Sequence, residues 1–168
     1  MKLIGLLLLF LIIPVISLAY TFSLEIFHSD YFNYDGLELL ATDGGRLKYY
    51  SAPTGKLLNE YGVSFSYIEK RSSDYFDEIG LPIMAKIYYG RVFDSNPEGV
   101  FGYEVGYRTG LMTAGFEKYG WLLGISPELY LRLQAAYVSV GTGLEIGNFF
   151  DDEIISSWEV KLELGYTF

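Results

Sequence analysis

The segment VKLELGYTF, from Val160 to Phe168, alternates strictly between apolar residues and glycine or polar residues. Successive side chains of a β-strand point to opposite faces, so such a segment has one apolar face and one face of other character. The apolar face consists of Val160, Leu162, Leu164, Tyr166 and Phe168. Chain ends are usually polar and frayed, so a large aromatic at Phe168 predicts that the apolar face of this strand lies against apolar surroundings.

The same period-two pattern recurs along the chain and predicts an all-β fold. Turn-forming residues separate the alternating segments, as in Asp94–Gly99 and Asn148–Glu153. The alternating segments are residues 20–28, 59–70, 78–90, 99–112, 118–125, 136–147 and 154–168.

Three features indicate that the apolar face points outward into lipid and the other face lines a lumen. Glycine recurs on the polar face, where small residues relieve crowding inside a narrow barrel. Tyrosine and tryptophan gather near strand ends, as interfacial rings do in membrane barrels. The segments 78–90, 99–112 and 154–168 also exceed the roughly 9–11 residues of a tilted membrane strand.

The number of strands is left open between eight and ten. Ten result if residues 37–42, 46–52 and 128–134 are separate spans, whereas the chain length favours eight. Residues 126–136 also fit a helix, with Ser126 as its N-cap and Pro127 in its first turn. Because the neighbouring segments are predicted strands, a strand is favoured over a helix for residues 126–136 too.

The N-terminal segment predicts export. Lys2, an apolar run from Leu3 to Ile13 and the small-residue site ending at Ala19 form the pattern of a cleaved signal peptide over residues 1–19. Residues 20–168 then form one domain. The chain has no cysteine, which excludes disulfides, and its net charge of −9 argues against nucleic-acid binding.

The last strand resembles the C-terminal signal of small bacterial outer-membrane β-barrel proteins, in which alternating apolar residues end in a terminal phenylalanine. The resemblance implies an antiparallel up-and-down transmembrane barrel of about eight strands in the outer membrane. It also implies that the barrel-assembly machinery and outer-membrane lipid are partners of this strand. The residues that carry the resemblance are Leu162, Leu164, Gly165, Tyr166 and Phe168.

Charged residues on the polar face predict a network inside the lumen. Opposite charges in a narrow bore must pair or stay hydrated, and an eight-stranded interior is just filled by side chains. A closed, porin-like barrel is therefore favoured over a small pore. The predicted network comprises Lys86, Glu104, Arg108, Glu145, Glu159, Lys161 and Glu163.

The sequence offers little catalytic or metal-binding chemistry. His28 precedes Ser29 and Asp30, but neighbouring strand residues face opposite ways and the His-x-Ser spacing of lipid A hydrolases is missing. Acidic residues gather in the loops, at Asp74–Glu78, Asp94–Glu98 and Asp151–Glu153, without the spacing of a calcium-binding loop. We therefore expect no catalytic residue, metal or cofactor.

The sequence favours a non-enzymatic outer-membrane barrel with a structural or surface-interaction role and an unknown ligand. The alternatives are a lipid-modifying outer-membrane enzyme, a small pore and a secreted ligand-binding barrel. The secreted barrel would leave the glycine-rich face in water and the terminal Phe168 unexplained.

Overall fold

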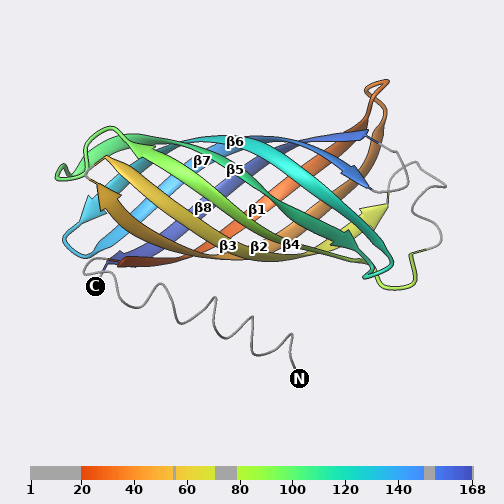
Figure 1. The fold of residues 1–168 in the computed structure, drawn as a ribbon, viewed down its shortest axis with the longest axis horizontal. Coiled ribbons are helices and arrows are strands. Elements are labelled where there is room, and N and C mark those ends of the chain that lie inside the picture. The colour runs from red at the N-terminus through yellow and green to blue at the C-terminus, as the bar shows by residue number, and fades with distance from the viewer. Residues whose placement is uncertain (1–19, 55, 71–78, 150–153, 168) are drawn as a thin grey trace.

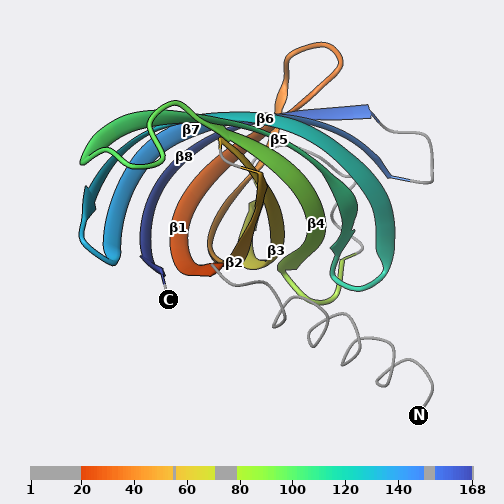
Figure 2. The ribbon, with the colours of Figure 1, turned by 60° about the vertical axis from the view of Figure 1, so that its left-hand side comes forward.

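A computed structural model describes residues 20–54, 56–70, 79–149 and 154–167, which form one antiparallel sheet closed into a barrel (Figure 1). Every strand pairs with its sequence neighbours, and β1 closes the barrel by pairing with β8 (Figure 2). The eight strands are β1 (Tyr20–Asn33), β2 (Glu38–Thr54), β3 (Leu57–Lys70), β4 (Ile83–Asp94), β5 (Phe101–Ala114), β6 (Lys118–Leu133), β7 (Ala136–Phe149) and β8 (Ile154–Thr167).

The strand connections alternate between the two ends of the barrel. The end where β1 begins and β8 finishes also carries the β2–β3, β4–β5 and β6–β7 turns, and we call it the terminus end (Figure 1). The opposite end carries the β1–β2, β3–β4, β5–β6 and β7–β8 connections, and we call it the loop end. Within the described ranges, no helix is long and apolar enough to cross a membrane.

The prediction of eight strands is confirmed, and the alternative of ten is wrong. The candidate spans 37–42 and 46–52 both fall on the single strand β2, which begins at Glu38, because Thr42–Arg46 continues the strand and does not turn. A Cβ on Gly44 would lie 2.7 Å from Ser66 Cα, so glycine here permits close approach of β2 to β3.

Residues 126–133 form the second half of β6. Strand was the favoured interpretation, and the alternative of a helix is wrong. Pro127 has no N–H to donate, and it has no register partner on β7, although it pairs with Val105 of β5. The strand thus accommodates Pro127 because pairing is lost toward β7 and kept toward β5.

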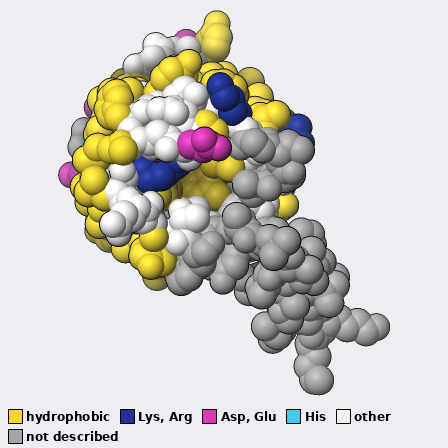
Figure 3. Space-filling model, turned by 90° about the vertical axis from the view of Figure 1, so that its left-hand side faces the viewer, with side chains coloured by type: hydrophobic (Ala, Val, Ile, Leu, Met, Phe, Trp, Pro, Cys, Tyr) yellow, Lys and Arg dark blue, Asp and Glu magenta, His cyan; other side chains and the backbone are white. Residues whose placement is uncertain are grey.

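The predicted orientation of the two faces, with the apolar face outward, is confirmed. Burial alternates along β6 with period two, so that Trp121, Leu123 and Ile125 are exposed while Gly120, Leu122 and Gly124 are buried. Seen from the terminus end, hydrophobic side chains surround the barrel wall (Figure 3). Because the strand register places the outward apolar residues of neighbouring strands side by side, they form one continuous apolar outer surface.

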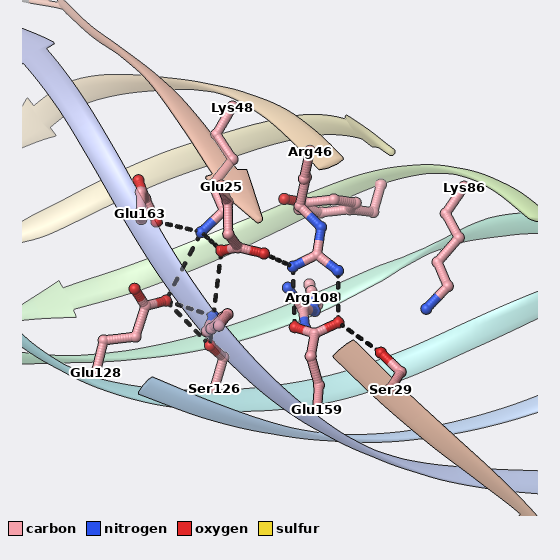
Figure 4. Close-up of polar contacts among 12 residues, drawn as sticks. Glu25, Ser29, Arg46, Lys48, Lys86, Arg108, Ser126, Glu128, Glu159 and Glu163 are labelled. Carbon is pink, nitrogen blue, oxygen red and sulfur yellow. Dashed lines mark hydrogen bonds and ion pairs between the residues drawn. The ribbon is translucent and has the colours of Figure 1, made fainter. Parts of the chain in front are cut away.

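The interior is divided into layers along the barrel axis. An apolar cluster fills the loop end and includes Tyr31, Leu40, Met112 and Phe149. A second cluster lies at the terminus end and consists of Tyr50, Val92, Tyr130 and Tyr137, with Leu58 packed against it. Most of the buried charged side chains lie between these clusters. Figure 4 shows the polar contacts among them.

Candidate functional site: the charged interior of the barrel

All seven charged residues that the sequence placed in the lumen are buried inside the barrel. They come from four strands: Lys86 on β4, Glu104 and Arg108 on β5, Glu145 on β7, and the remaining three on β8. Six of them make ion pairs within the described interior, and Glu104 is the exception among the interactions seen there.

The half of the network nearer the loop end is organised around two arginines. Arg46 donates from Nη2 to Glu159 Oε2 at 2.7 Å and also contacts Glu25. Arg108 donates from Nη2 to the other carboxylate oxygen of Glu159 at 2.7 Å. Arg108 Nε also lies 3.0 Å from Glu145. Each guanidinium thus joins two carboxylates, which its planar fork of donors is suited to do.

Lys86 extends this chain of pairs. Its ammonium group lies 2.5 Å from Glu145 Oε2 and 5.3 Å from the centre of the Tyr31 ring. Tyr31 belongs to the apolar cluster at the loop end. The charged layer therefore borders directly on the apolar layer, with a cation–π contact at the boundary.

The half nearer the terminus end is organised around two lysines (Figure 4). Lys48 lies 2.5 Å from Glu163 and also contacts Glu25. Lys161 lies 2.5 Å from Glu128 and 3.7 Å from Glu25. Tyrosine and serine hydroxyls satisfy further carboxylate oxygens: Tyr50 and Tyr137 donate to Glu163, and Ser126 and Ser139 donate to Glu128.

Glu25, Glu128 and Glu163 have carboxylate oxygens within 4.8 Å of one another, which is the spacing of a possible metal site. The ammonium groups of Lys48 and Lys161 lie among these oxygens. The cluster therefore already holds two cations of the chain itself, and a metal ion there would have to displace them.

Six further buried charged residues join this interior and are missing from the predicted network: Glu25, Arg46, Lys48, Glu60, Asp94 and Glu128. The alternation already placed Glu25 on the polar face, and Glu60 has the same parity as Gly62. Arg46 and Lys48 were assigned to a short separate span, and Glu128 to a segment of uncertain type. Parity was therefore sufficient to find Glu25 and Glu60, whereas Arg46, Lys48 and Glu128 could be assigned only after β2 and β6 were each known to be one strand.

The structure separates His28 from Ser29, as strand geometry predicts. His28 faces outward, with Nδ1 2.7 Å from Asp43 Oδ1 and Nε2 3.2 Å from Asp30 Oδ1. Ser29 faces inward and donates to Glu159 at 3.3 Å. No Ser–His pair of the kind that activates a nucleophile forms between these neighbours.

The residues of the predicted assembly signal lie on both sides of β8. Leu162, Leu164 and Tyr166 point outward and are about half exposed, whereas Gly165 points inward. A Cβ on Gly165 would collide with the ring of Tyr137. Phe168 and the predicted signal peptide, residues 1–19, lie outside the described residues.

The acidic loops give a mixed outcome. Asp94 is buried inside the barrel, where it accepts a hydrogen bond from Tyr130 Oη at 2.6 Å and pairs with Arg132 at 3.2 Å, so its assignment to a solvated loop is wrong. Glu98 is exposed in the β4–β5 turn. The clusters 74–78 and 151–153 lie outside the described residues.

An aromatic ladder crosses the outer wall. The rings of Phe22, Tyr49, Tyr61 and Tyr89, on the neighbouring strands β1 to β4, follow one another at centroid distances of 5.2, 6.1 and 5.2 Å. Tyr89 also donates to Asn59 Oδ1 at 3.1 Å. Such a row of rings is typical of the boundary between lipid and water.

The chain has the fold of small bacterial outer-membrane β-barrels. Neisserial surface protein A superposes with a TM-score of 0.70 at 10% identity, over 89% of this chain and 99% of that one. Ail, the attachment invasion locus protein of Yersinia pestis, superposes with a TM-score of 0.55 at 13% identity, over 91% and 100%. Ail in complex with the heparin analogue sucrose octasulfate gives 0.53 at 15% identity, over 89% and 98%.

At the level of sequence, no family model and no curated protein matches the chain. The structural likeness therefore describes the fold, and the role of the protein has to be argued from its own residues.

Proposed function

We propose that this protein is a non-enzymatic outer-membrane barrel whose lumen is closed by its own side chains and whose loop end takes part in surface interactions. The observation that carries the proposal is the layered interior, in which paired charges lie between two apolar clusters. Two cavities bordering the interior have volumes of about 10 and 20 Å³, which is room for about one water molecule each.

The outer wall supports a location in a membrane. Large apolar side chains such as Leu24, Ile87, Leu123 and Leu164 are more than half exposed, which is costly in water over a continuous surface. An outer-membrane location also accounts for the predicted signal peptide over residues 1–19 and for the signal-like strand β8, which we propose is read by the barrel-assembly machinery.

The connections support an orientation in that membrane. Bacterial barrels have short periplasmic turns and longer outer loops. The turns at the terminus end include two-residue links at 55–56 and 134–135, while the β3–β4 connection at the loop end runs from 71 to 82. The loop end therefore faces the exterior.

The charge of the loop end favours cationic or neutral partners. Its described residues include the acidic side chains Asp35, Glu38, Asp43, Glu69 and Glu117. Such a surface repels sulfated glycans. A heparin analogue is bound by Ail, whereas we expect no such binding by this chain at physiological salt.

Fractionation and gel mobility test the proposal. The full chain expressed in a Gram-negative host should appear in the outer-membrane fraction as a form that migrates differently with and without boiling, since a folded barrel resists detergent until heated. Recovery as a soluble periplasmic or secreted protein would overturn the membrane location. Hydrolysis of lipid A by the purified protein would overturn the non-enzymatic role.

A further inference from the structure

Glu104 differs from every other buried carboxylate in the described interior. Glu60 receives a hydrogen bond from Tyr88 at 2.8 Å and lies 3.9 Å from Lys48, and Asp94 pairs with Arg132. The other five pair with the lysines and arginines of the charged layer. Glu104 is 6% exposed, and none of the hydrogen bonds and ion pairs seen among the described residues includes it.

The surroundings of Glu104 make this lack of a partner costly. The strand register places Glu104 opposite Asp94 on β4 and opposite Glu128 on β6, so three inward carboxylates stand in one row. The buried charged residues also have an excess of acids. The acids are Glu25, Glu60, Asp94, Glu104, Glu128, Glu145, Glu159 and Glu163, and the bases are Arg46, Lys48, Lys86, Arg108 and Lys161. A buried charge without compensation is strongly unfavourable.

A cavity lies beside this carboxylate at the terminus end of the lumen. Its volume is about 20 Å³, enough for one water-sized occupant. Besides Glu104, oxygen-bearing residues line it: Thr21, Tyr50, Tyr137 and Thr167. The hydroxyls of Thr21 and Thr167 lie 2.8 Å apart.

The polar groups of the cavity wall are oriented to leave oxygen lone pairs available. Tyr50 and Tyr137 donate their hydroxyl protons to Glu163, so their oxygens remain acceptors. Arg132 also lines the cavity, but its guanidinium is engaged by Asp94 and by the carbonyl of Pro97. Glu104 thus borders a space whose wall presents four hydroxyl oxygens and the guanidinium that Asp94 engages.

We propose that Glu104 and the hydroxyl oxygens of this cavity bind one small, hard metal cation at the periplasmic mouth of the barrel. A carboxylate with several neutral oxygens is the ligand chemistry of Na⁺ or Ca²⁺. The cation compensates the row of carboxylates and links β5 to β1 and β8 through Thr21 and Thr167. It therefore stabilises the barrel at the point where its first and last strands meet.

The test measures thermal unfolding of the purified full-length protein in non-ionic detergent. Unfolding is followed in NaCl, in CaCl₂ and in N-methyl-D-glucamine chloride, all at one ionic strength, with a chelator in the metal-free sample. Binding to the folded state should raise the unfolding temperature of the wild type with saturation, by about 5–10 °C at a hundred times Kd. The sodium and calcium arms identify which ion is bound.

Two variants and a control tie the effect to the site. Glu104→Gln should abolish the cation-dependent rise, whereas Glu98→Gln, on the exposed turn at the same end, should retain it in full. Thr21→Val, which removes one hydroxyl at nearly constant volume, should raise the half-saturating concentration several-fold even if Glu104→Gln fails to fold. A wild-type protein that responds to no metal, or an equal response in wild type, Glu104→Gln and Thr21→Val, overturns the site and means that Glu104 is neutralised by a proton.

Discussion

At the scale of single residues, side chains that are adjacent in the sequence face different surroundings, one outside the barrel wall and the next inside the lumen. Val105 is one-third exposed on the outer wall, while the adjacent Gly106 is buried in the lumen. In our membrane assignment, the same change of polarity therefore has opposite consequences at two successive positions.

A charge placed on the outer wall should be costly. Ile125 is the central outward residue of β6, between Tyr107 of β5 and Leu144 of β7. Ile125→Arg should lower the free energy of unfolding in lipid by about 2–4 kcal/mol, because an arginine near the bilayer midplane loses its hydration. Urea titration of the barrel in vesicles measures the change.

Gly106→Ser is the matched control on the inward face. A Cβ at Gly106 would lie 3.3 Å from Val92 Cγ2 and 3.7 Å from Glu60, a fit that a small shift of side chains accommodates. Its effect should be below that of Ile125→Arg. If the serine proved more damaging than the arginine, the outer wall would not face lipid.

Parity predicts much of the charged interior where a strand is recognised, although Glu25 and Glu60 were missed within such segments. Lys86, Arg108 and Glu145 lie in segments with unbroken alternation, and parity alone placed them inside. Their partners could not be predicted, because an ion pair such as Arg46–Glu159 joins β2 to β8 across the lumen. Such a contact depends on barrel closure and strand tilt, which no local pattern contains.

At the scale of strands, glycine acts through packing more than through turns. Gly44 and Gly45 resemble a turn signal, yet both lie inside β2. Gly44 pairs with Ser66 of β3, and the backbone of β3 approaches so closely that a side chain at Gly44 has no room. The sequence alone suggests a break between residues 42 and 46, because a glycine pair gives the same local pattern in a turn and inside a strand.

Alanine substitution distinguishes these two glycines. Gly44→Ala should destabilise the barrel by about 1–3 kcal/mol, because its Cβ would lie 2.7 Å from Ser66 Cα and the strands would have to separate. Gly45→Ala should be mild, since its nearest contact is the Glu25 carbonyl at 3.7 Å. Equal unfolding free energies for the two variants would contradict close packing at Gly44.

The closing strand should have a role in assembly that is separable from stability. We expect deletion of Phe168 to reduce the yield of folded protein in the outer membrane, because the terminal aromatic belongs to the proposed assembly signal. Refolding of the same variant from urea into detergent should be nearly normal, since β8 keeps its register with β1 and β7 through Thr167 and Tyr166. Comparing yield in cells with refolding in vitro checks this, and normal yield of the deletion in cells would contradict it.

At the scale of the whole molecule, the paired charges and the apolar clusters act together on permeation. The eight-stranded fold could be predicted from alternation, glycine placement and chain length. The layering of the interior could not, because Leu40, Met112 and Phe149 come from β2, β5 and β7 and meet only at the loop end. An apolar layer of this kind opposes ion entry even where the neighbouring layer is charged.

The unmodified protein in planar bilayers should show little or no steady current, since long side chains of both signs span the bore and pair. Replacing Lys86 and Arg108 together with alanine removes both cationic partners of Glu145 and one partner of Glu159. The freed carboxylates then recruit water and mobile cations, so the double variant should show small, flickering, cation-selective openings.

Lys56→Ala, in the exposed β2–β3 turn, is the control and should show no current. Large, stable channels from the unmodified protein would refute a closed lumen and support a transport role.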